Sequence, residues 1–368
     1  MSAIVLALLV LAASGAGYQL IGRVRDVARL PPPGRLVDVG NGRRLHLHCM
    51  GAGQPDVKPD TVARADVEPA VIFDAGIAAS SLSWSRVQPA VAAFAQACSY
   101  DRPGLAWSDA IPGPLTAARL AHLLHALVAA AAIPPPFVLV AHSFGTFVVR
   151  AFAHAYPTDV AGLVLVDPIY PSEWIDMTAA GRRRLRGGAC LSRVGAALAA
   201  VGFVRLCLTL LVAGSTAVPG RVSRMFGSEA ATTLRRLVGE VQKLPPELWP
   251  AVAAHWSRPK CFVAMARHLS GLPRSAREIA ATGSLGAMPL VVITAASQPP
   301  AVREEHARIA RLSSRGRHVI AGAGGHWIHL DQPDVVVRAI RDVIEMARHG
   351  APDGSESATQ DSGSVTRD

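Results

Sequence analysis

Lysine, nucleotide-binding glycine loops and metal-binding patterns are scarce or missing in this sequence. Only 3 of the 37 basic residues are lysine and the arginines are scattered, so the net charge of +10 reflects composition rather than a nucleic-acid surface. The densest basic cluster, residues 182–186, has no interleaved aromatic residues and no nucleic-acid motif nearby. An anionic membrane surface suits this cluster better, and we expect no nucleic-acid partner. The sequence has no internal repeat and no metal-ligand spacing, so we expect no cofactor and no metal.

Charge is also missing from the first 22 residues, and residues 3–11 are purely aliphatic. About 20 apolar residues can span a bilayer as a helix, so we predict an uncleaved membrane anchor over residues 1–22. A cleaved signal peptide and a buried helix are the alternatives. The lack of basic residues at the start and the weak cleavage sequence at residues 15–17 argue against cleavage.

The remaining chain has the composition of one large α/β domain, because 50% of the residues are hydrophobic. Residues 31–34, Pro-Pro-Pro-Gly, separate the anchor from this domain. Residues 349–368 are polar and rich in glycine and serine, and we expect them to form a disordered tail.

The most informative segment is residues 137–146. Five apolar residues typical of a buried strand lead into His-Ser-Phe-Gly, and an apolar pattern with helical periodicity follows. A strand, a sharp turn and a helix are the context of a nucleophile elbow, which exposes one side chain above the sheet. Such a turn needs small residues two positions before and after the exposed side chain, and Ala141 and Gly145 meet this condition. Ser143 is therefore the predicted nucleophile.

A candidate general base follows the last strand-like segment, residues 317–325. Glycines at the end of this segment leave the backbone free to turn just before His326. In the order nucleophile, acid, histidine, a histidine on this loop is the expected general base. His329 is the local alternative, but the glycines directly precede His326, which we predict to be the base.

Five segments in this order resemble the α/β-hydrolase superfamily, in particular its serine esterases and lipases: residues 70–77, residues 100–108, the elbow, residues 162–168 and the His326 loop. The resemblance extends from about Gly34 to Arg348. It implies an α/β-hydrolase fold, which is a mostly parallel eight-stranded sheet in the order 1-2-4-3-5-6-7-8 with flanking helices.

The resemblance also implies a core formed by residues 30–168 and 287–348, interrupted by a helical cap at residues 169–286. Within the cap, residues 203–212 are strongly hydrophobic. They are either packed cap core or a surface that faces a membrane or an acyl chain.

By the same resemblance, Gly76-Ile77 lies on the loop after the third strand. The backbone N–H groups of Ile77 and Phe144 would then form the oxyanion hole. The alternative for this loop is an ordinary glycine turn at the end of a strand.

The acid has several candidates. Many relatives carry an aspartate after the penultimate strand, which here is residues 289–294, but residues 295–303 contain no carboxylate. Some lipases and esterases of the superfamily place the acid after the strand that follows the elbow helix, where this chain has Asp167. We therefore predict Asp167 as the acid. The alternatives are a structural role for Asp167, a Ser–His dyad, or an acid among Glu304, Glu305 and Asp331.

The cysteines bear on the cellular compartment. In the strand order that the resemblance implies, the strands carrying Cys49 and Cys98 are neighbours, so these residues can form a disulfide, which suits an oxidising compartment. Two free thiols in a cytosolic core are the alternative. An extracytoplasmic location conflicts with the positive-inside rule, by which Arg23, Arg25 and Arg29 would keep the domain cytoplasmic. We favour the extracytoplasmic side.

We predict a membrane-associated serine hydrolase that cleaves a small or lipid-like carboxylic ester, or a related acyl compound, through an acyl-enzyme on Ser143. Epoxide hydrolases and haloalkane dehalogenases of the superfamily use aspartate at the elbow, so Ser143 argues against those reactions. Thioesterase, lactonase, peptidase and C–C hydrolase activities remain open. A non-catalytic, membrane-tethered binding protein with this fold is the alternative from another class.

Overall fold

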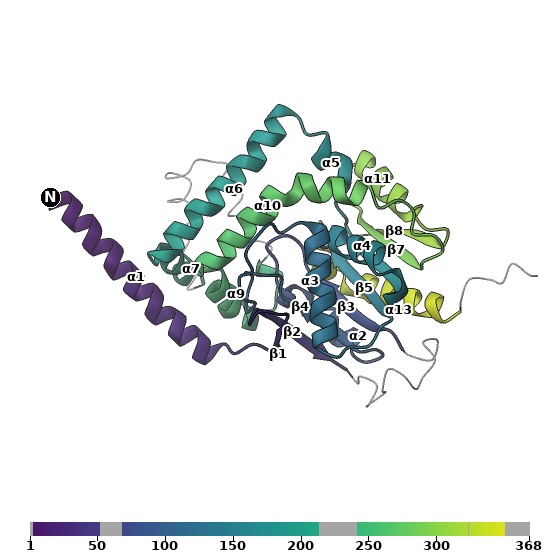
Figure 1. The fold of residues 1–368 in the computed structure, drawn as a ribbon, viewed down its shortest axis with the longest axis horizontal. Coiled ribbons are helices and arrows are strands. Elements are labelled where there is room, and N and C mark those ends of the chain that lie inside the picture. Colours follow the sequence, from purple (N-terminus) through teal and green to yellow (C-terminus); the bar gives the residue numbers. More distant parts are fainter. Residues whose placement is uncertain (1–2, 52–67, 213–240, 323, 350–368) are drawn as a thin grey trace, which may run out of the picture.

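A single eight-stranded sheet with helices on both faces forms the centre of the computed structural model, which describes residues 3–51, 68–212, 241–322 and 324–349 (Figure 1). The order β1-β2-β4-β3-β5-β6-β7-β8 confirms the strand order expected from the sequence. The β1–β2 and β2–β4 pairs are antiparallel, and every other pair is parallel. The strands are β1 (Arg35–Asp38), β2 (Arg44–Met50), β3 (Ala70–Asp74), β4 (Ala97–Tyr100), β5 (Phe137–His142), β6 (Val160–Val166), β7 (Leu290–Ala295) and β8 (Gly316–Ala321).

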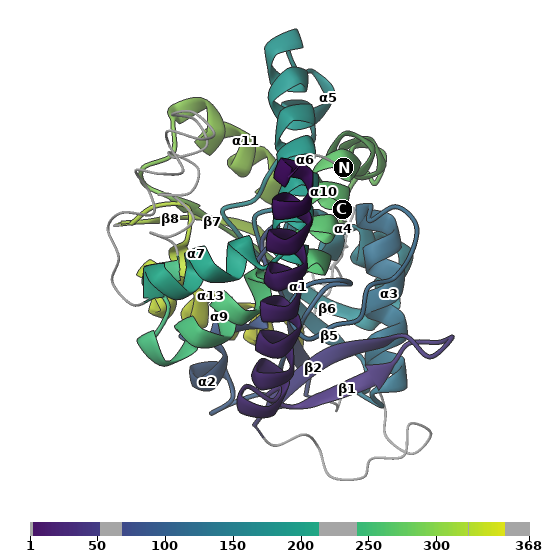
Figure 2. The same ribbon diagram turned by 90° about the vertical axis from the view of Figure 1, so that its left-hand side faces the viewer.

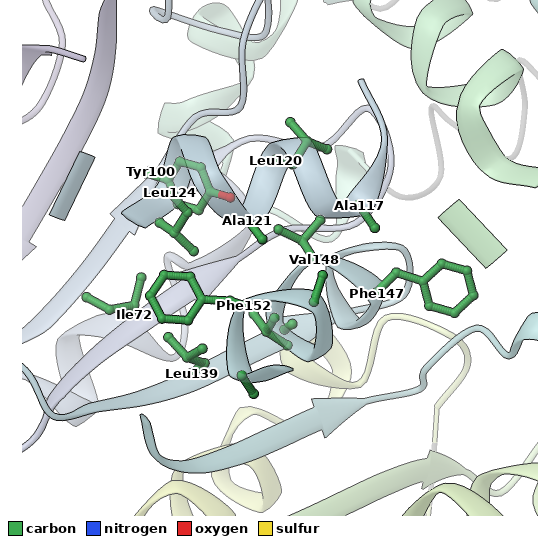
Figure 3. Packing of buried hydrophobic residues seen from close by; sticks show 14 of the residues in the cluster. Ile72, Tyr100, Ala117, Leu120, Ala121, Leu124, Leu139, Phe147, Val148 and Phe152 are labelled. Atoms are coloured by element: carbon green, nitrogen blue, oxygen red, sulfur yellow. The ribbon is translucent and has the colours of Figure 1, made fainter. Parts of the chain in front are cut away.

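The central strands are apolar throughout because both faces of the sheet are covered. Successive side chains of β5 point to opposite faces. Leu139 packs in the core beneath α3 (Ala117–Ala130) and α4 (Gly145–Ala155), whereas Val140 packs in the core beneath α13 (Pro333–Arg348). Figure 3 shows the first of these cores, where Leu139 and Ile72 of the sheet lie against Phe152.

The smaller helices complete the two layers and the loops of this domain. They are η2 (Ser81–Trp84), α2 (Gln88–Val91), η3 (Pro157–Asp159), α11 (Pro300–Ala310) and α12 (Ile328–Asp331).

Helices replace the strand–helix alternation between β6 and β7, in the interval where a cap was expected. In the described part of this interval they are α5 (Pro171–Ile175), α6 (Ala179–Ala200), α7 (Phe203–Val212), η4 (Pro246–Leu248), α9 (Trp249–Trp256) and α10 (Pro259–Ala280). Helix α10 is amphipathic, and its buried residues recur every three or four positions, as in Ala264, His268 and Leu272. It packs between α6 and the α3–α4 layer, and so joins the helical insertion (Pro171–Ala280) to the sheet domain.

The N-terminal segment is one continuous helix, α1 (Ala3–Arg29), which extends past the expected anchor boundary at residue 22. Among the described helices, α1 is long enough and apolar enough to cross a membrane. Its first half projects away from the domain, whereas its second half lies against the helical insertion (Figures 1 and 2). The tail expected at residues 349–368 lies outside the described residues, apart from His349.

Cys49 and Cys98 face each other in the β2–β4 register and form a disulfide with an S–S distance of 2.04 Å. Cys190, Cys207 and Cys261 are free thiols. The strand order thus brings together the two cysteines that the sequence suggested as a pair.

Reduction of this disulfide should lower the free energy of unfolding by about 2–4 kcal/mol, because the bond closes a long loop in the unfolded chain. Urea titrations of the wild type and of Cys98→Ala, each with and without dithiothreitol, would measure the loss. Cys190→Ser, which removes an exposed free thiol, is the matched control and should behave as the wild type. Equal stability of the oxidised and reduced wild type would contradict the pairing.

Candidate active site

Ser143 occupies a strained turn between β5 and α4. Its φ angle is +52°, in the left-handed region that non-glycine residues rarely adopt. The Ser143 N–H donates to the Val166 carbonyl at 3.0 Å, and the Thr146 hydroxyl donates to the Ser143 carbonyl at 2.6 Å. A Cβ on Gly145 would lie 2.7 Å from the Ala75 carbonyl oxygen, so only glycine fits there. The turn therefore has the geometry of a nucleophile elbow.

Asp167 lies directly after β6 and contacts His326. Its carboxylate Oδ2 is 2.6 Å from His326 Nδ1. The same carboxylate accepts the Ala295 N–H on Oδ1 at 3.0 Å and the Gln298 Nε2–H on Oδ2 at 2.5 Å. The Asp167 side chain is fully buried, whereas that of His326 is 38% exposed. A buried carboxylate with these donors fixes the orientation of a histidine ring that remains open to solvent.

The His326 loop is held beside the elbow by His142, the residue before Ser143. His142 Nε2–H donates to the His326 carbonyl at 2.9 Å, and the two rings are 4.5 Å apart. Within the described part of the chain, Ser143 Oγ and His326 form no hydrogen bond. Catalytic hydrogen bonds are often loose in ligand-free enzymes and tighten when substrate binds.

His329, the alternative base, is a core residue. Its ring is fully buried 4.7 Å from that of Trp84, and neither ring nitrogen has a hydrogen-bond partner. Burial, aided by nearby His326, lowers the pKa of His329 to about 3. This residue is therefore neutral at physiological pH and has no access to substrate.

The other acids considered from the sequence lie elsewhere. Glu304 and Glu305 on α11 form surface ion pairs with Arg308, and Asp331 pairs with Lys243 at 3.1 Å. Of all the carboxylates considered from the sequence, only Asp167 pairs with His326.

The loop after β3 passes directly over the elbow. A Cβ on Gly76 would lie 3.6 Å from the Ser143 Cβ. The next residue is Ile77, and neither its N–H nor that of Phe144 donates to a described main-chain carbonyl outside the regular helices and strands. Phe144 directly follows Ser143, and Ile77 directly follows Gly76, so the two residues expected to form an oxyanion hole lie on the two segments that meet at the elbow.

Arg102 holds this loop from below, a role that the sequence did not reveal. Its guanidinium is buried, donates to the carbonyls of Ala75 and Gly76, and lies 5.1 Å from the centre of the Phe144 ring. Arg102 Nε also pairs with Asp74 Oδ1 at 3.4 Å. Burial raises the pKa of Asp74 to about 6, and the positive charge of Arg102 acts in the opposite direction. Arg102 therefore fixes the loop that leads to Ile77 and also contacts Phe144, the two residues expected to form the oxyanion hole.

Gln298 was also missed. It follows β7, where many relatives carry the acid, and its amide instead holds the carboxylate of Asp167. The sequence offered one signal for this role, which is an amide donor in a loop that has no carboxylate.

A cavity in the helical insertion lies between α5, α6 and α10 and has a volume of about 330 Å³. Trp174, Met177 and Leu185 supply its apolar wall, and Arg186 and Arg277 supply positive charge. Neither Ser143 nor His326 lines this cavity.

Comparisons with known proteins agree with this fold. The sequence model of the alpha/beta hydrolase family matches residues 71–339. An AB hydrolase superfamily protein of Gibberella zeae is 29% identical over 135 residues, which cover 36% of this chain and 39% of that protein. An uncharacterized protein of Schizosaccharomyces pombe is 30% identical over 40% of this chain and 30% of its own length. The chain thus matches less than half the length of these relatives.

Two solved structures share the fold. A thermophilic esterase from Thermogutta terrifontis has a TM-score of 0.57 and 18% identity, with 85% of this chain and 98% of that chain covered. A putative epoxide hydrolase from Pseudomonas aeruginosa has a TM-score of 0.59 and 17% identity, with 87% and 98% covered. At these identities the likeness shows the fold alone.

Replacing His329 by phenylalanine should make the protein more stable to acid. The folded pKa of His329, about 3, lies below its ordinary value of 6.5, so the unfolded chain takes up a proton and stability falls as the pH drops from 6.5 towards 3. At pH 5 the loss from this group is about 2 kcal/mol. Urea titrations at pH 8 and pH 5 should show that His329→Phe avoids this loss.

His154→Phe replaces an exposed histidine and is the matched control, which should lose as much stability as the wild type. An equal loss in His329→Phe and the wild type would show that His329 is not a buried neutral group.

Proposed function

Because the chain belongs to the alpha/beta hydrolase family, we propose that it hydrolyses a carboxylic ester, or a related acyl compound, through an acyl-enzyme on Ser143. The observation that carries this proposal is the 2.6 Å contact between His326 and a buried, doubly hydrogen-bonded Asp167, next to a serine at a strained elbow. Nucleophile, acid and base follow one another along the chain as Ser143, Asp167 and His326, which is the order typical of the family.

In the proposed reaction, His326 accepts the proton of Ser143 as Oγ attacks the acyl carbon. The Ile77 and Phe144 amides stabilise the negative charge that develops on the carbonyl oxygen. Protonated His326 then gives its proton to the departing alcohol, while Asp167 stabilises the imidazolium. Water, activated by His326, attacks the acyl-enzyme and releases the acid. Serine at the elbow favours this route over the epoxide hydrolase and dehalogenase chemistry associated with the fold.

Thioesters, lactones, peptides and activated C–C bonds can react through the same groups, so the bond cleaved is the open part of this proposal. A non-catalytic binding protein is the competing function. It has no need of a buried carboxylate aimed at a half-exposed histidine.

Membrane association is the second part of the proposal. The exposed apolar residues of α1 support it, and they make a lipophilic ester the substrate that the enzyme meets most often. The Cys49–Cys98 disulfide supports the extracytoplasmic side.

Ser143→Ala and His326→Ala should each lower kcat/KM for a short p-nitrophenyl ester by several orders of magnitude, because the triad acts as a unit. Neither change should alter the melting temperature by more than a few degrees, since one side chain is a small hydroxyl and the other is part-exposed. Ser172→Ala, an exposed serine on α5, is the matched control. Wild-type turnover in Ser143→Ala would overturn the proposed function.

Asp167→Asn should reduce kcat strongly, by up to about 10⁴-fold as in serine proteases, because asparagine stabilises the wrong histidine tautomer. An activated ester will show a smaller loss, since its leaving group needs little protonation. Glu304→Gln and Glu305→Gln remove surface carboxylates and should stay within about a few-fold of the wild type. A crippled glutamate variant beside an active Asp167→Asn would move the acid to α11.

A further inference from the structure

One face of α1 is docked on the helical insertion rather than free. The less exposed residues of its second half are Gly15, Gln19, Gly22 and Asp26, which recur at the helical spacing of four, three and four. A Cβ on Gly15 would lie 2.2 Å from the Val201 carbonyl oxygen, so the glycine allows close approach of the two backbones. This half of α1 therefore belongs to the fold.

A buried polar network holds the docked half. Arg205 of α7 donates from Nε to Gln19 Oε1 at 2.8 Å and pairs with Asp26 Oδ2 at 2.7 Å. The same guanidinium donates to Ser257 Oγ at 2.8 Å, and Gln19 Nε2–H donates to the Ser257 carbonyl at 2.9 Å. Because the pair is largely buried, undocking α1 would leave the Arg205 charge without its carboxylate partner.

The first half of α1 makes a different surface. Every residue from 3 to 14 is exposed, and most are large apolar residues. At 1.5 Å per residue this stretch is about 18 Å long. The hydrocarbon core of a bilayer is about 30 Å thick. From a headgroup layer at Gly15, Ile4 would therefore reach the middle of the bilayer.

Helix α6 runs across the direction of α1 at the level where docking begins (Figures 1 and 2). Its exposed side carries both charge and apolar groups, and the apolar groups continue onto α7 through Leu206 and Leu210. Among the described residues, the arginines of α6 form no ion pair with a carboxylate. The exposed charged and larger apolar residues of α6 that do not line the cavity are Arg183, Arg184, Cys190, Leu191 and Val194, whereas Arg182, Arg186 and Arg193 line it.

We propose that α1, α6 and α7 form one membrane-docking surface for a leaflet that contains acidic phospholipids. Residues 3–14 enter the hydrocarbon, the exposed leucines of α6 and α7 lie at the interface, and the α6 arginines bind headgroup phosphates through their planar guanidinium groups. This proposal rests on the proposed membrane association, and it moves the membrane boundary from residue 22 to about Gly15. The helical insertion, with its arginine-lined cavity, is then held at the bilayer surface.

Fluorescence depth measurements test the geometry directly in the full-length protein. A bimane label on native Cys190 in phosphatidylglycerol vesicles should be quenched best by a nitroxide at the headgroup. A label on Ile4→Cys, with Cys190 and Cys207 changed to serine, should be quenched best by a nitroxide deep in the acyl chains. An Ile4 label that responds to an aqueous quencher trapped inside the vesicles, or a Cys190 label that is unaffected by lipid, would overturn the proposal.

Charge variants test the lipid preference. Arg183→Gln and Arg184→Gln combined should weaken binding to phosphatidylglycerol vesicles roughly 30-fold and leave the weaker binding to phosphatidylcholine unchanged. The control combines Arg338→Gln and Arg341→Gln on α13, which should bind as the wild type. Equal losses in both sets would mean that net charge, not the α6 surface, drives binding. Turnover of a water-soluble ester should be unchanged in both sets.

Truncations separate the two halves of α1. Removing residues 1–14 should abolish vesicle binding without changing the melting temperature, whereas removing residues 1–22 should also lower the melting temperature, because Gln19 is lost from the Arg205 network. Lipid-free dimers that dissociate when residues 1–14 are removed, without vesicle binding by the full chain, would assign the surface to a second copy and refute the proposal. Vesicle binding does not require Ser143, so it can be measured in Ser143→Ala, and failure here is distinct from failure of the proposed hydrolysis.

Discussion

The strained turn at Ser143 is the constraint on which the rest of the site depends. A left-handed serine between a buried strand and a buried helix persists only where its surroundings leave no relaxed alternative. Here the carbonyl oxygens of Asp74 and Ala75 fill the space above Gly145, and the β3 loop lies against His142. Arg102 fixes that loop through its carbonyls and contacts the Phe144 ring. The elbow and the candidate oxyanion site are thus held by one set of contacts.

A second strained residue lies opposite the first. Asp167 also has a positive φ, +42°, and its N–H donates to the Ile293 carbonyl at 2.7 Å. This twist at the end of β6 turns the carboxylate towards β7, where Ala295 and Gln298 supply donors. The β7 loop therefore contributes an amide to the acid instead of the acid itself. Six non-glycine residues have a positive φ in the described part of the chain, and two of them, Ser143 and Asp167, are proposed for catalysis.

Much of the fold could be predicted because its signals are local. The apolar strands, the small residues around Ser143 and the glycines before His326 each impose their conformation within a few positions, and the strand order followed from the resemblance. The choice of Asp167 over Glu304 was harder, because one follows a strand and the other lies within the helix after the next strand, and only spatial proximity to His326 decides between them. The position of Arg102 in the sequence gave no indication of the groups that it contacts, and the only signal for Gln298 was its place in a loop without carboxylates.

The role of α1 could not be predicted for a related reason. Its composition matches a membrane helix as far as residue 22, but Gln19 contacts Arg205 across a separation of 186 residues, which no local pattern reveals. The apolar stretch therefore appeared longer than its exposed part. The exposed face of α6 could not be predicted either. Its arginines have no regular helical periodicity, and the way α10 packs against α6 determines which of its residues are exposed.

The central claim is that Ser143 carries a covalent acyl group during turnover. Rapid acid quenching of the enzyme with an excess of a p-nitrophenyl ester, followed by peptide mass spectrometry, measures this directly. The account predicts that the peptide containing Ser143 gains the mass of the acyl group within the first turnover, together with a stoichiometric burst of p-nitrophenol. Steady turnover with neither a burst nor an acylated peptide from any part of the chain would contradict it.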